Sequence, residues 1–378
     1  MKAVTYQGFL KVKVKEVEEP KIKNPEDIIV KITHSSICGS DLHFYHGMIT
    51  SLEKDYILGH ESIGIVENIG QDVERLKKGD KVVIPFNIAC GKCKYCQSDL
   101  ESQCSEVNNE GEMGACYGCS RLFGDYDGSQ AEYVRVPFAN YAPFKVPDNN
   151  ELPDEELVLL TDALPTAYWG VDNAGVKMGD TVIILGCGPI GLLAQKIAWL
   201  KGAKRVIAVD RLTYRLEHSK KWNHTECFNF EENLELSNLL LEITNGGADV
   251  VIDCVGMSGK MAPIEVVETA LQIQGGALGA IQFASQVVRK GGTIQLVGTY
   301  GLRYNHFPLG DLFNRNITLK MGLAPVIHHI PFLYDMIKYK HLNIGDIITH
   351  KIPLAEAEHA YKIFHGRKEQ CLKIILHP

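Results

Sequence analysis

Four cysteines lie close together in the sequence with the spacing of a metal-binding cluster. Cys90, Cys93, Cys96 and Cys104 form a C-x2-C-x2-C-x7-C pattern within fifteen residues. Four thiolates at this density can complete a tetrahedron around zinc, and a tetrahedron filled by protein ligands leaves no position for a substrate. The pattern therefore predicts a structural zinc site, with Lys92 and Lys94 offsetting part of the thiolate charge.

Other potential metal ligands are more scattered. Cys38 in the segment C-G-S-D-L-H and His60 in G-H-E offer a thiolate and an imidazole. A catalytic zinc usually has three protein ligands, and spacing alone does not name the third. Cys116 and Cys119 form a further C-x2-C pair, which we interpret as free thiols, while an alternative metal site that uses them stays open.

A glycine-rich segment predicts a site for a dinucleotide. Residues 186–191 follow an apolar strand expected at 181–185 and open a helix expected at 190–200. Such glycines allow a tight turn and a close approach of the backbone, so that a pyrophosphate can bind at the helix N-terminus. The motif is formed by Gly186, Gly188, Pro189, Ile190 and Gly191, with Cys187 between the first two glycines.

An acidic residue beyond this motif bears on the choice of cofactor. Asp210 ends the next expected strand, 19 residues after Gly191. A carboxylate there can bind both ribose hydroxyls and would repel a 2′-phosphate, so we predict NAD rather than NADP. Arg211 and Arg215 weaken this preference, because arginine is the residue that an NADP site would use.

The surrounding patterns predict two kinds of architecture. Up to about Pro153, short β-branched runs bounded by glycine, proline and aspartate indicate a β-rich region. From Thr181 onward, strands alternate with helices, which favours a doubly wound parallel sheet. After about Ala324 the chain is expected to leave that sheet, with a helix near 330–339 and a strand at 371–376. The nucleotide-binding domain is therefore predicted to be inserted in a domain made from both ends of the chain.

Composition excludes several classes of protein. The net charge of −7 and the pI near 6.1 disfavour binding to nucleic acid or to an anionic membrane. Residues 269–288 carry no formal charge, but their glutamines would be costly in lipid, so we predict no membrane span. Eleven cysteines with uneven spacing and no secretory signal favour thiolates over disulfides, and hence a cytoplasmic location.

The whole chain resembles the zinc-dependent medium-chain alcohol dehydrogenases. The resemblance covers C-G-S-D-x-H, G-H-E, the four cysteines and G-x-G-x-x-G, in that order. Residues 161–168, residues 297–301 and the long stretch between Asp253 and Gly291 further resemble the formaldehyde-dehydrogenase-like branch.

The resemblance implies a fold class: α/β, with a doubly wound parallel Rossmann sheet inserted in a β-rich GroES-like catalytic domain. Residues 1–163 would form the catalytic domain, with the structural zinc lobe at 90–104. Residues 164–324 would form the dinucleotide-binding domain, and residues 325–378 would return to the catalytic domain.

The resemblance also implies a catalytic zinc bound by Cys38, His60 and Asp162. Many relatives have a cysteine in place of this aspartate, and a carboxylate is a harder ligand than a thiolate. Glu61 would be either an occasional fourth ligand or a carboxylate close to the metal, and Asp41 would orient His60 by accepting its other N–H. With the structural site, this gives two zinc ions per chain and NAD as the expected cofactors.

The implied activity is the reversible oxidation of a small alcohol to an aldehyde or ketone with NAD. Ser40 would receive the hydroxyl proton and pass it through the cofactor ribose to His43 near the surface, while Thr166 would pack beside the nicotinamide. His43 could alternatively be a solvated surface residue, and no role is assigned to His46, His328 or His329. A homodimer or homotetramer is expected.

Two alternative functions stay open at this point. One is a dehydrogenase for polyols or 3-hydroxy amino acids on the same scaffold, although no additional polar groups for such a substrate can be assigned in the sequence. The other is a dinucleotide-binding protein that has lost its chemistry. Such a protein should lack the zinc ligands or the proton relay, whereas this chain has residues suited to both.

Overall fold

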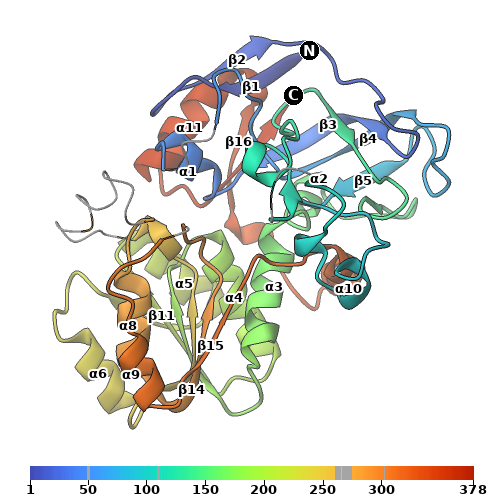
Figure 1. Cartoon of the computed structure of the whole chain (residues 1–378). Helices are drawn as coiled ribbons and strands as arrows, with labels where there is room; N and C mark the ends of the chain where they lie inside the picture. Colours follow the sequence, from blue (N-terminus) through green and yellow to red (C-terminus); the bar gives the residue numbers. More distant parts are fainter. Residues whose placement is uncertain (49–51, 109–110, 112, 260–264, 266–274, 302) are drawn as a thin grey trace. The chain divides into compact units, whose positions relative to one another are not determined.

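A computed structural model describes residues 1–48, 52–108, 111, 113–259, 265, 275–301 and 303–378 (Figure 1). The chain divides into two compact units. The first contains Met1–Pro165 together with Pro325–Pro378, and the second contains Thr166–Ala324. Each unit is built around its own β-sheet.

The first unit contains a seven-stranded sheet, mostly antiparallel. Its order is β16-β17-β3-β4-β5-β9, with β8 pairing to β3. The strands of this sheet are β3 (Ile28–Ile37), β4 (Ser62–Ile69), β5 (Lys81–Ile84), β8 (Tyr133–Val136), β9 (Phe144–Lys145), β16 (Ile348–Pro353) and β17 (Lys373–His377). Two small pairs accompany it: β1 (Lys2–Tyr6) with β2 (Val12–Glu16), and β6 (Asn87–Ile88) with β7 (Ala115–Cys116).

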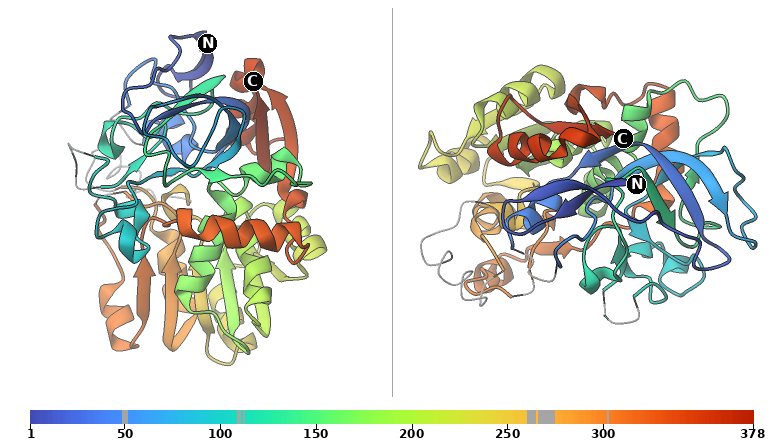
Figure 2. Two further views of the ribbon diagram at one scale, coloured as in Figure 1. Left: turned by 90° about the vertical axis from the view of Figure 1, so that its right-hand side faces the viewer. Right: turned by 90° about the horizontal axis from the view of Figure 1, so that it is seen from above.

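The C-terminal strand joins the N-terminal part of the chain within this sheet. β17 runs antiparallel to β3, with Ile374 opposite Ile37. In Figure 2 the red C-terminal part of the chain lies beside blue N-terminal strands. The strand begins at Lys373, two positions after the predicted start at Cys371. This pairing brings the end of the chain next to Cys38, which directly follows β3.

Short helices surround the first sheet. The α-helices are α1 (Asp41–Tyr45), α2 (Asp154–Val158), α10 (Ile330–Lys338) and α11 (Ala357–Gly366). Six 3-10 turns complete the described part of this unit: Cys96–Ser98, Glu101–Gln103, Arg121–Phe123, Ile327–His329, Gly345–Ile347 and Leu354–Glu356. Helix α3 (Ala163–Ala174) begins at the boundary between the units.

The second unit has the predicted doubly wound parallel sheet. Its order is β12-β11-β10-β13-β14-β15, and every neighbouring pair is parallel. The strands are β10 (Thr181–Leu185), β11 (Arg205–Asp210), β12 (Glu226–Asn229), β13 (Ala248–Asp253), β14 (Val288–Leu296) and β15 (Thr318–Met321). The helices are α4 (Pro189–Leu200), α5 (Thr213–Asn223), α6 (Leu236–Ile243), α8 (Gly279–Val287) and α9 (Leu309–Asn314), with a 3-10 turn at Gly256–Ser258.

Burial explains why the central strands of this sheet contain few polar residues. Val182, Ile183 and Ile184 of β10 are fully buried, because helices cover both faces of the sheet (Figure 1). The strand order reverses between β10 and β13, and ligands of such sheets bind beyond the carboxyl ends of the strands at this point. The glycine motif directly follows β10 at that position.

No helix in the described ranges is long and apolar enough to cross a bilayer. Residues 269–274 of the uncharged stretch lie outside these ranges, and the remainder includes α8 and the start of β14.

Candidate active site and metal clusters

The four cysteines of the zinc lobe converge. Each sulfur lies within 4.8 Å of the other three. The separations are 3.5 Å between Cys93 and Cys96, 3.9 Å between Cys93 and Cys104, and 4.0 Å between Cys90 and Cys96. A tetrahedral zinc with Zn–S bonds of about 2.3 Å requires sulfurs about 3.8 Å apart. The geometry of this four-cysteine cluster therefore fits a zinc ion with no open position.

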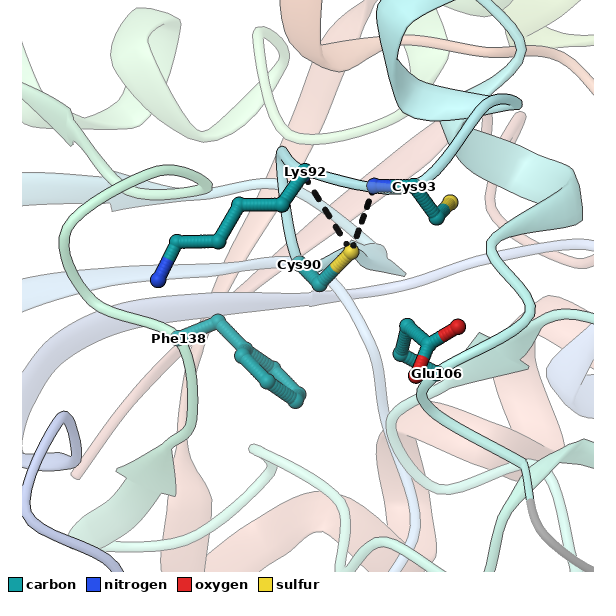
Figure 3. A pocket seen from close by; sticks show the side chains of 5 residues that line it. All are labelled: Cys90, Lys92, Cys93, Glu106 and Phe138. Carbon is teal, nitrogen blue, oxygen red and sulfur yellow. Dashed lines mark hydrogen bonds between the residues drawn. The ribbon is translucent and has the colours of Figure 1, made fainter.

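Backbone donors rather than lysine amines surround the sulfurs. The N–H groups of Lys92 and Cys93 each donate to Cys90 Sγ at 3.3 Å, beside a surface hollow that is also lined by Glu106 and Phe138 (Figure 3). The amine of Lys92 instead lies 3.2 Å from Glu26, and that of Lys94 lies over the Tyr95 ring. The amines of both lysines thus contact other groups, and the offset of thiolate charge by these residues stays a prediction.

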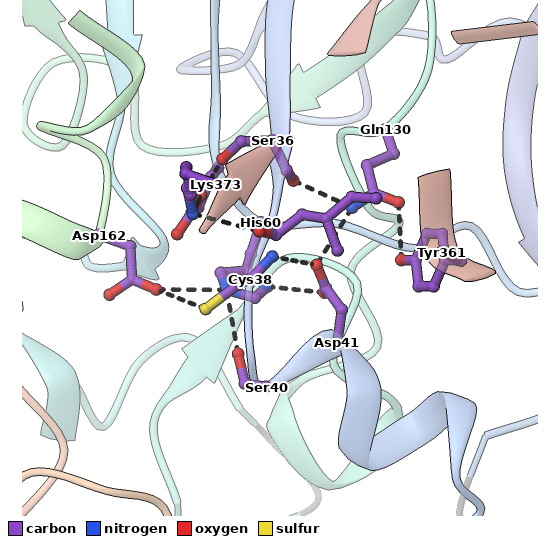
Figure 4. Close-up of polar contacts among 11 residues, drawn as sticks. Ser36, Cys38, Ser40, Asp41, His60, Gln130, Asp162, Tyr361 and Lys373 are labelled. Atoms are coloured by element: carbon purple, nitrogen blue, oxygen red, sulfur yellow. Dashed lines mark hydrogen bonds and ion pairs between the residues drawn. The ribbon is translucent and has the colours of Figure 1, made fainter. Parts of the chain in front are cut away.

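The scattered ligands also converge. One ligand atom each from Cys38, His60, Glu61 and Asp162 lies within 4.8 Å of the others. Asp162 Oδ2 is 3.4 Å from Cys38 Sγ and 3.3 Å from His60 Nε2 (Figure 4). Cys38 follows β3, His60 precedes β4 and Asp162 precedes α3, so three distant segments supply this group. We call Cys38, His60 and Asp162 the mixed-ligand cluster.

The electrostatics of the mixed-ligand cluster suit a cation. Burial, together with the carboxylates of Asp162 and Glu61, raises the pKa of the Cys38 thiol to about 11. A bound cation would reverse this effect, because it stabilises the thiolate. Glu61 Oε1 is buried and accepts no hydrogen bond from the described residues. A thiolate, an imidazole and a carboxylate are all accepted zinc ligands, so the residues present fit this metal.

Glu61 is held by a lysine that the sequence analysis did not consider. The Lys373 ammonium forms an ion pair with Glu61 Oε2, and the Ser36 hydroxyl donates to the same oxygen. Lys373 and Glu61 are 1% and 0% exposed, so the pair is buried. In the sequence, the feature that could have pointed to Lys373 is a single charged residue within the apolar C-terminal run. The ion pair favours the interpretation of Glu61 as a carboxylate near the metal.

A chain of polar contacts supports His60 from behind (Figure 4). His60 Nδ1 lies 3.2 Å from Asp41 Oδ1, as expected for a carboxylate that orients the ring. Gln130 Nε2 donates to Asp41 Oδ2 at 3.1 Å, and the Tyr361 hydroxyl donates to Gln130 Oε1 at 2.9 Å. Sequence reasoning missed Gln130 and Tyr361, since neither belongs to a motif.

Cys116 and Cys119 lie near His60 rather than in the zinc lobe cluster. Both thiols are buried and unoxidised. A hydrogen bond from Cys116 lowers the pKa of Cys119 to about 7 despite its burial, and His60 contributes further. Within the described ranges, neither sulfur belongs to a group of three potential metal ligands. The interpretation as free thiols therefore stands in the structure.

The two expected relay residues have different surroundings. Ser40 Oγ lies 3.3 Å from His60 Nε2, at the edge of the mixed-ligand cluster. His43, on α1, is only 5% exposed. The expectation that His43 lies near the surface was wrong, and so was its alternative as a solvated residue, because α1 turns this side chain into the unit. Burial lowers the pKa of His43 to about 4, with a further contribution from His46.

The glycine motif in the second unit has the geometry of a tight turn. Gly186 has φ +90°, and a Cβ on Gly191 would lie 1.8 Å from the Gly186 carbonyl oxygen. Pro189 is in the first turn of α4, where its missing N–H costs no helical hydrogen bond, and Ile190 follows it. Gly188 precedes the helix, and a Cβ there would lie 3.5 Å from an Arg215 nitrogen.

Asp210 is held firmly at the end of β11. Its Oδ2 accepts from the Cys187 N–H at 2.7 Å, and its Oδ1 accepts from the N–H groups of Arg211 and Leu212 at 2.6 and 2.9 Å. The Arg211 side chain lies 3.8 Å from Glu231. The carboxylate is thus fixed beside the glycine motif of the same unit. Thr166 is half-buried near the start of α3.

A third group of potential ligands joins the zinc lobe to the C-terminal segment. His328 Nδ1 lies 3.0 Å from both carboxylate oxygens of the buried Glu101, and Asp99 is close by. The Glu101 carboxylate also accepts from Tyr141. These contacts explain His328 as a partner of Glu101 without any metal.

Comparisons with known proteins agree with this arrangement. Residues 24–148 match the family model described as Alcohol dehydrogenase GroES-like domain, and residues 189–273 match Zinc-binding dehydrogenase. The zinc-type alcohol dehydrogenase-like protein AdhB of Bacillus subtilis is 55% identical over 378 residues, covering 100% of both chains. Glutathione-independent formaldehyde dehydrogenase of Pseudomonas aeruginosa is 33% identical, covering 96% of this chain and 94% of the relative.

A solved structure has the same fold. Alcohol dehydrogenase TADH from Thermus sp. ATN1 superimposes with a TM-score of 0.85 at 34% identity, covering 100% of this chain and 99% of the other. The match extends over both units of the chain.

Proposed function

Because this chain belongs to the zinc-dependent alcohol dehydrogenase family and is a dehydrogenase, we propose that it interconverts a small alcohol and its aldehyde or ketone with NAD, using two zinc ions per chain. The observation that carries the proposal is the convergence of Cys38, His60 and Asp162 from three distant segments. In a protein that had lost its catalytic activity, we would not expect a thiol, an imidazole and a carboxylate to stay together in this way.

The mixed-ligand cluster would hold the catalytic zinc and the four-cysteine cluster the structural one. A zinc ion at the mixed-ligand cluster supplies Lewis acidity, which lowers the pKa of an alcohol hydroxyl. Asp41 orients the His60 ring through the contact at Nδ1, so that Nε2 faces the cluster. Lys373 holds Glu61 in a buried ion pair and balances part of the negative charge beside the cluster.

Ser40 and His43 would move the hydroxyl proton. The Ser40 hydroxyl lies next to His60 Nε2 and can accept a proton from the substrate oxygen while it donates its own. The depressed pKa of His43 keeps the imidazole neutral near pH 7, so the ring can take up a proton on one nitrogen only as it gives one up from the other. Thr166 would pack beside the nicotinamide ring, as the family resemblance implies.

NAD bound to the second unit would supply the hydride acceptor for the alcohol carbon. The Gly186–Gly191 turn at the N-terminus of α4 would bind its pyrophosphate. Asp210 would bind the ribose diol and repel a 2′-phosphate, and its three backbone N–H donors hold the carboxylate in place. The pairing of Arg211 with Glu231 supports NAD, because it draws that guanidinium toward a carboxylate. Arg215, near Gly188, is the remaining basic group of this segment that could favour NADP.

The decisive experiment is a panel of small alcohols, aldehydes and polyols with NAD and NADP, followed by nicotinamide absorbance on protein of measured zinc content. We expect turnover of simple alcohols, with a higher kcat/KM for NAD than for NADP. Asp210→Ser should narrow that difference, whereas Asp172→Ser, a control on α3, should not. Equal kcat/KM values for both cofactors in the wild type would contradict the role of Asp210.

Two further features belong to the proposal. We expect a dimer or tetramer, which sedimentation equilibrium would test. We place the protein in the cytoplasm because eleven cysteines of uneven spacing favour thiolates over disulfides.

A further inference from the structure

Two histidines outside the family motifs touch one another at the end of α1. His46 directly follows α1, and His365 lies in the last turn of α11. The Nε2 atom of His46 is 2.7 Å from Nδ1 of His365, and their ring centroids are 4.8 Å apart. At this distance one imidazole donates an N–H and the other accepts it. The pair can therefore pass a proton between α1 and α11.

Because His43 is buried, a proton on this residue requires a route to solvent. A proton that reaches His43 must leave again before the next turnover, yet this side chain is only 5% exposed. His46 caps α1, and its N–H donates to the Leu42 carbonyl at 2.8 Å, so the helical turn continues to His46. His43 and His46 are three positions apart on this turn, and residues at this spacing lie on one face. The half-buried His46 acts on the pKa of His43, which places the two imidazoles within electrostatic range of each other.

Exposure increases along the three histidines. His43 is buried, His46 is half-buried and His365 is exposed. The Tyr45 ring lies 5.9 Å from His46 and 5.6 Å from His365, and the Tyr361 ring lies 5.4 Å from Tyr45. These aromatic rings flank the path between the buried and the exposed ends.

We propose that His43, His46 and His365 form a proton-transfer chain, which we call the histidine chain, that carries the substrate hydroxyl proton to the exposed end of α11. The inference rests on the proposed alcohol oxidation. In each oxidation the carbon loses a hydride to NAD and the oxygen loses one proton. Each imidazole gains that proton on one ring nitrogen, releases a proton from the other and returns to its neutral form. In the reverse direction the chain supplies the proton.

The test replaces His46 and His365 separately by glutamine. We expect kcat for alcohol oxidation to fall on the order of ten-fold, less than the 10²–10⁴-fold expected for a group that takes the proton directly. Zinc content and the KM for NAD should not change. The kinetic isotope effect of D2O should increase and that of carbon-deuterated alcohol should decrease, because proton transfer becomes slow. Added imidazole should restore kcat.

The matched control is His359→Gln, which removes an exposed histidine from the same helix. The double variant His46→Gln/His365→Gln should be no slower than the slower single variant, because both residues act in one path. His365 is exposed, so its variant keeps the test valid if His46→Gln does not fold.

The outcomes separate the two proposals. If the wild type oxidises alcohols and both glutamine variants behave like His359→Gln, without a change in the D2O effect, the histidine chain is refuted alone. If the wild type oxidises no alcohol in the panel, the proposed function fails and the histidine chain fails with it.

Discussion

The two metal clusters of the first unit are assembled in opposite ways. The four-cysteine cluster comes from one short segment, and its thiolates are surrounded by backbone N–H groups of that same segment. The mixed-ligand cluster joins residues that lie 22 and 102 positions apart along the chain, and its supporting groups come from β17 and α11 near the C-terminus. A local cluster can stabilise its own loop, whereas the mixed-ligand cluster requires the whole sheet to be in place.

The functional consequence follows from the ligand count. Four thiolates leave zinc no open position, so a zinc ion in the four-cysteine cluster would contribute to folding and not to turnover. Three ligands of mixed type leave one position for a substrate oxygen. The comparison predicts that damage to one cluster affects stability, while damage to the other affects turnover.

The largest effect is expected at Asp162. Asp162→Ala should remove the catalytic zinc and lower turnover by at least about 10³-fold, equivalent to about 4 kcal/mol. The four-cysteine zinc and NAD binding should survive, because neither involves this side chain. Metal analysis should therefore show one zinc per chain instead of two, and NAD titration should be unchanged.

Two further replacements decide what Asp162 does. Asp162→Cys should restore part of the metal binding, since thiolate is an accepted ligand. Asp162 directly precedes α3, so its alternative role is to cap that helix. An Asp162→Asn enzyme with two zinc ions and near-normal turnover would favour the cap, because asparagine caps well and binds zinc poorly.

The matching experiment on the four-cysteine cluster is Cys93→Ser. We expect loss of one zinc and of several kcal/mol from the stability of the lobe, because the metal contributes folding free energy. Turnover per folded molecule should change little. Thermal unfolding and metal analysis measure both effects, with Cys227→Ser, a half-buried thiol of the second unit, as the control. Unchanged zinc content and melting temperature would exclude the structural zinc.

The buried ion pair beside the mixed-ligand cluster gives a third prediction. Lys373→Met should cost about 3–5 kcal/mol of folding stability, because Glu61 would be left buried without its partner. The double variant Lys373→Met/Glu61→Gln should recover most of that loss. Urea unfolding measures both. If Lys373→Met alone were as stable as the wild type, Glu61 would have to pair with another cation in that variant.

The smallest effect is expected at Tyr361, at the far end of the chain of polar contacts behind His60. Tyr361→Phe removes the hydroxyl that orients Gln130, at a cost of about 1 kcal/mol. We expect zinc at the mixed-ligand cluster to be lost to a chelator roughly ten-fold more readily, the lower end of the effect seen for groups that orient ligands. Tyr334→Phe, which loses a hydroxyl bonded to Asn150, is the matched control. Equal zinc affinity in both variants would mean that Gln130 does not require the Tyr361 hydroxyl to keep its position.

Sequence patterns were sufficient where the chemistry is local. The four cysteines, the glycine turn with Asp210, and the alternation of strands and helices each depend on neighbours within a few tens of residues. A thiolate cluster or a tight turn forms from its own segment, so its residue types and spacing are direct evidence for it. These features were recognisable without coordinates.

Only the tertiary structure placed the remaining residues. The pairing of β17 with β3 brings Lys373 to Glu61, and the packing of α11 brings Tyr361 to Gln130 and His365 to His46. The His43 side chain is buried as well, which its position in a motif did not indicate. Contacts between segments hundreds of residues apart depend on strand register and helix packing, and no local pattern encodes them. The sequence therefore determined the ligand types and the turn geometry, while the fold decided which side chains support them and where the proton can leave.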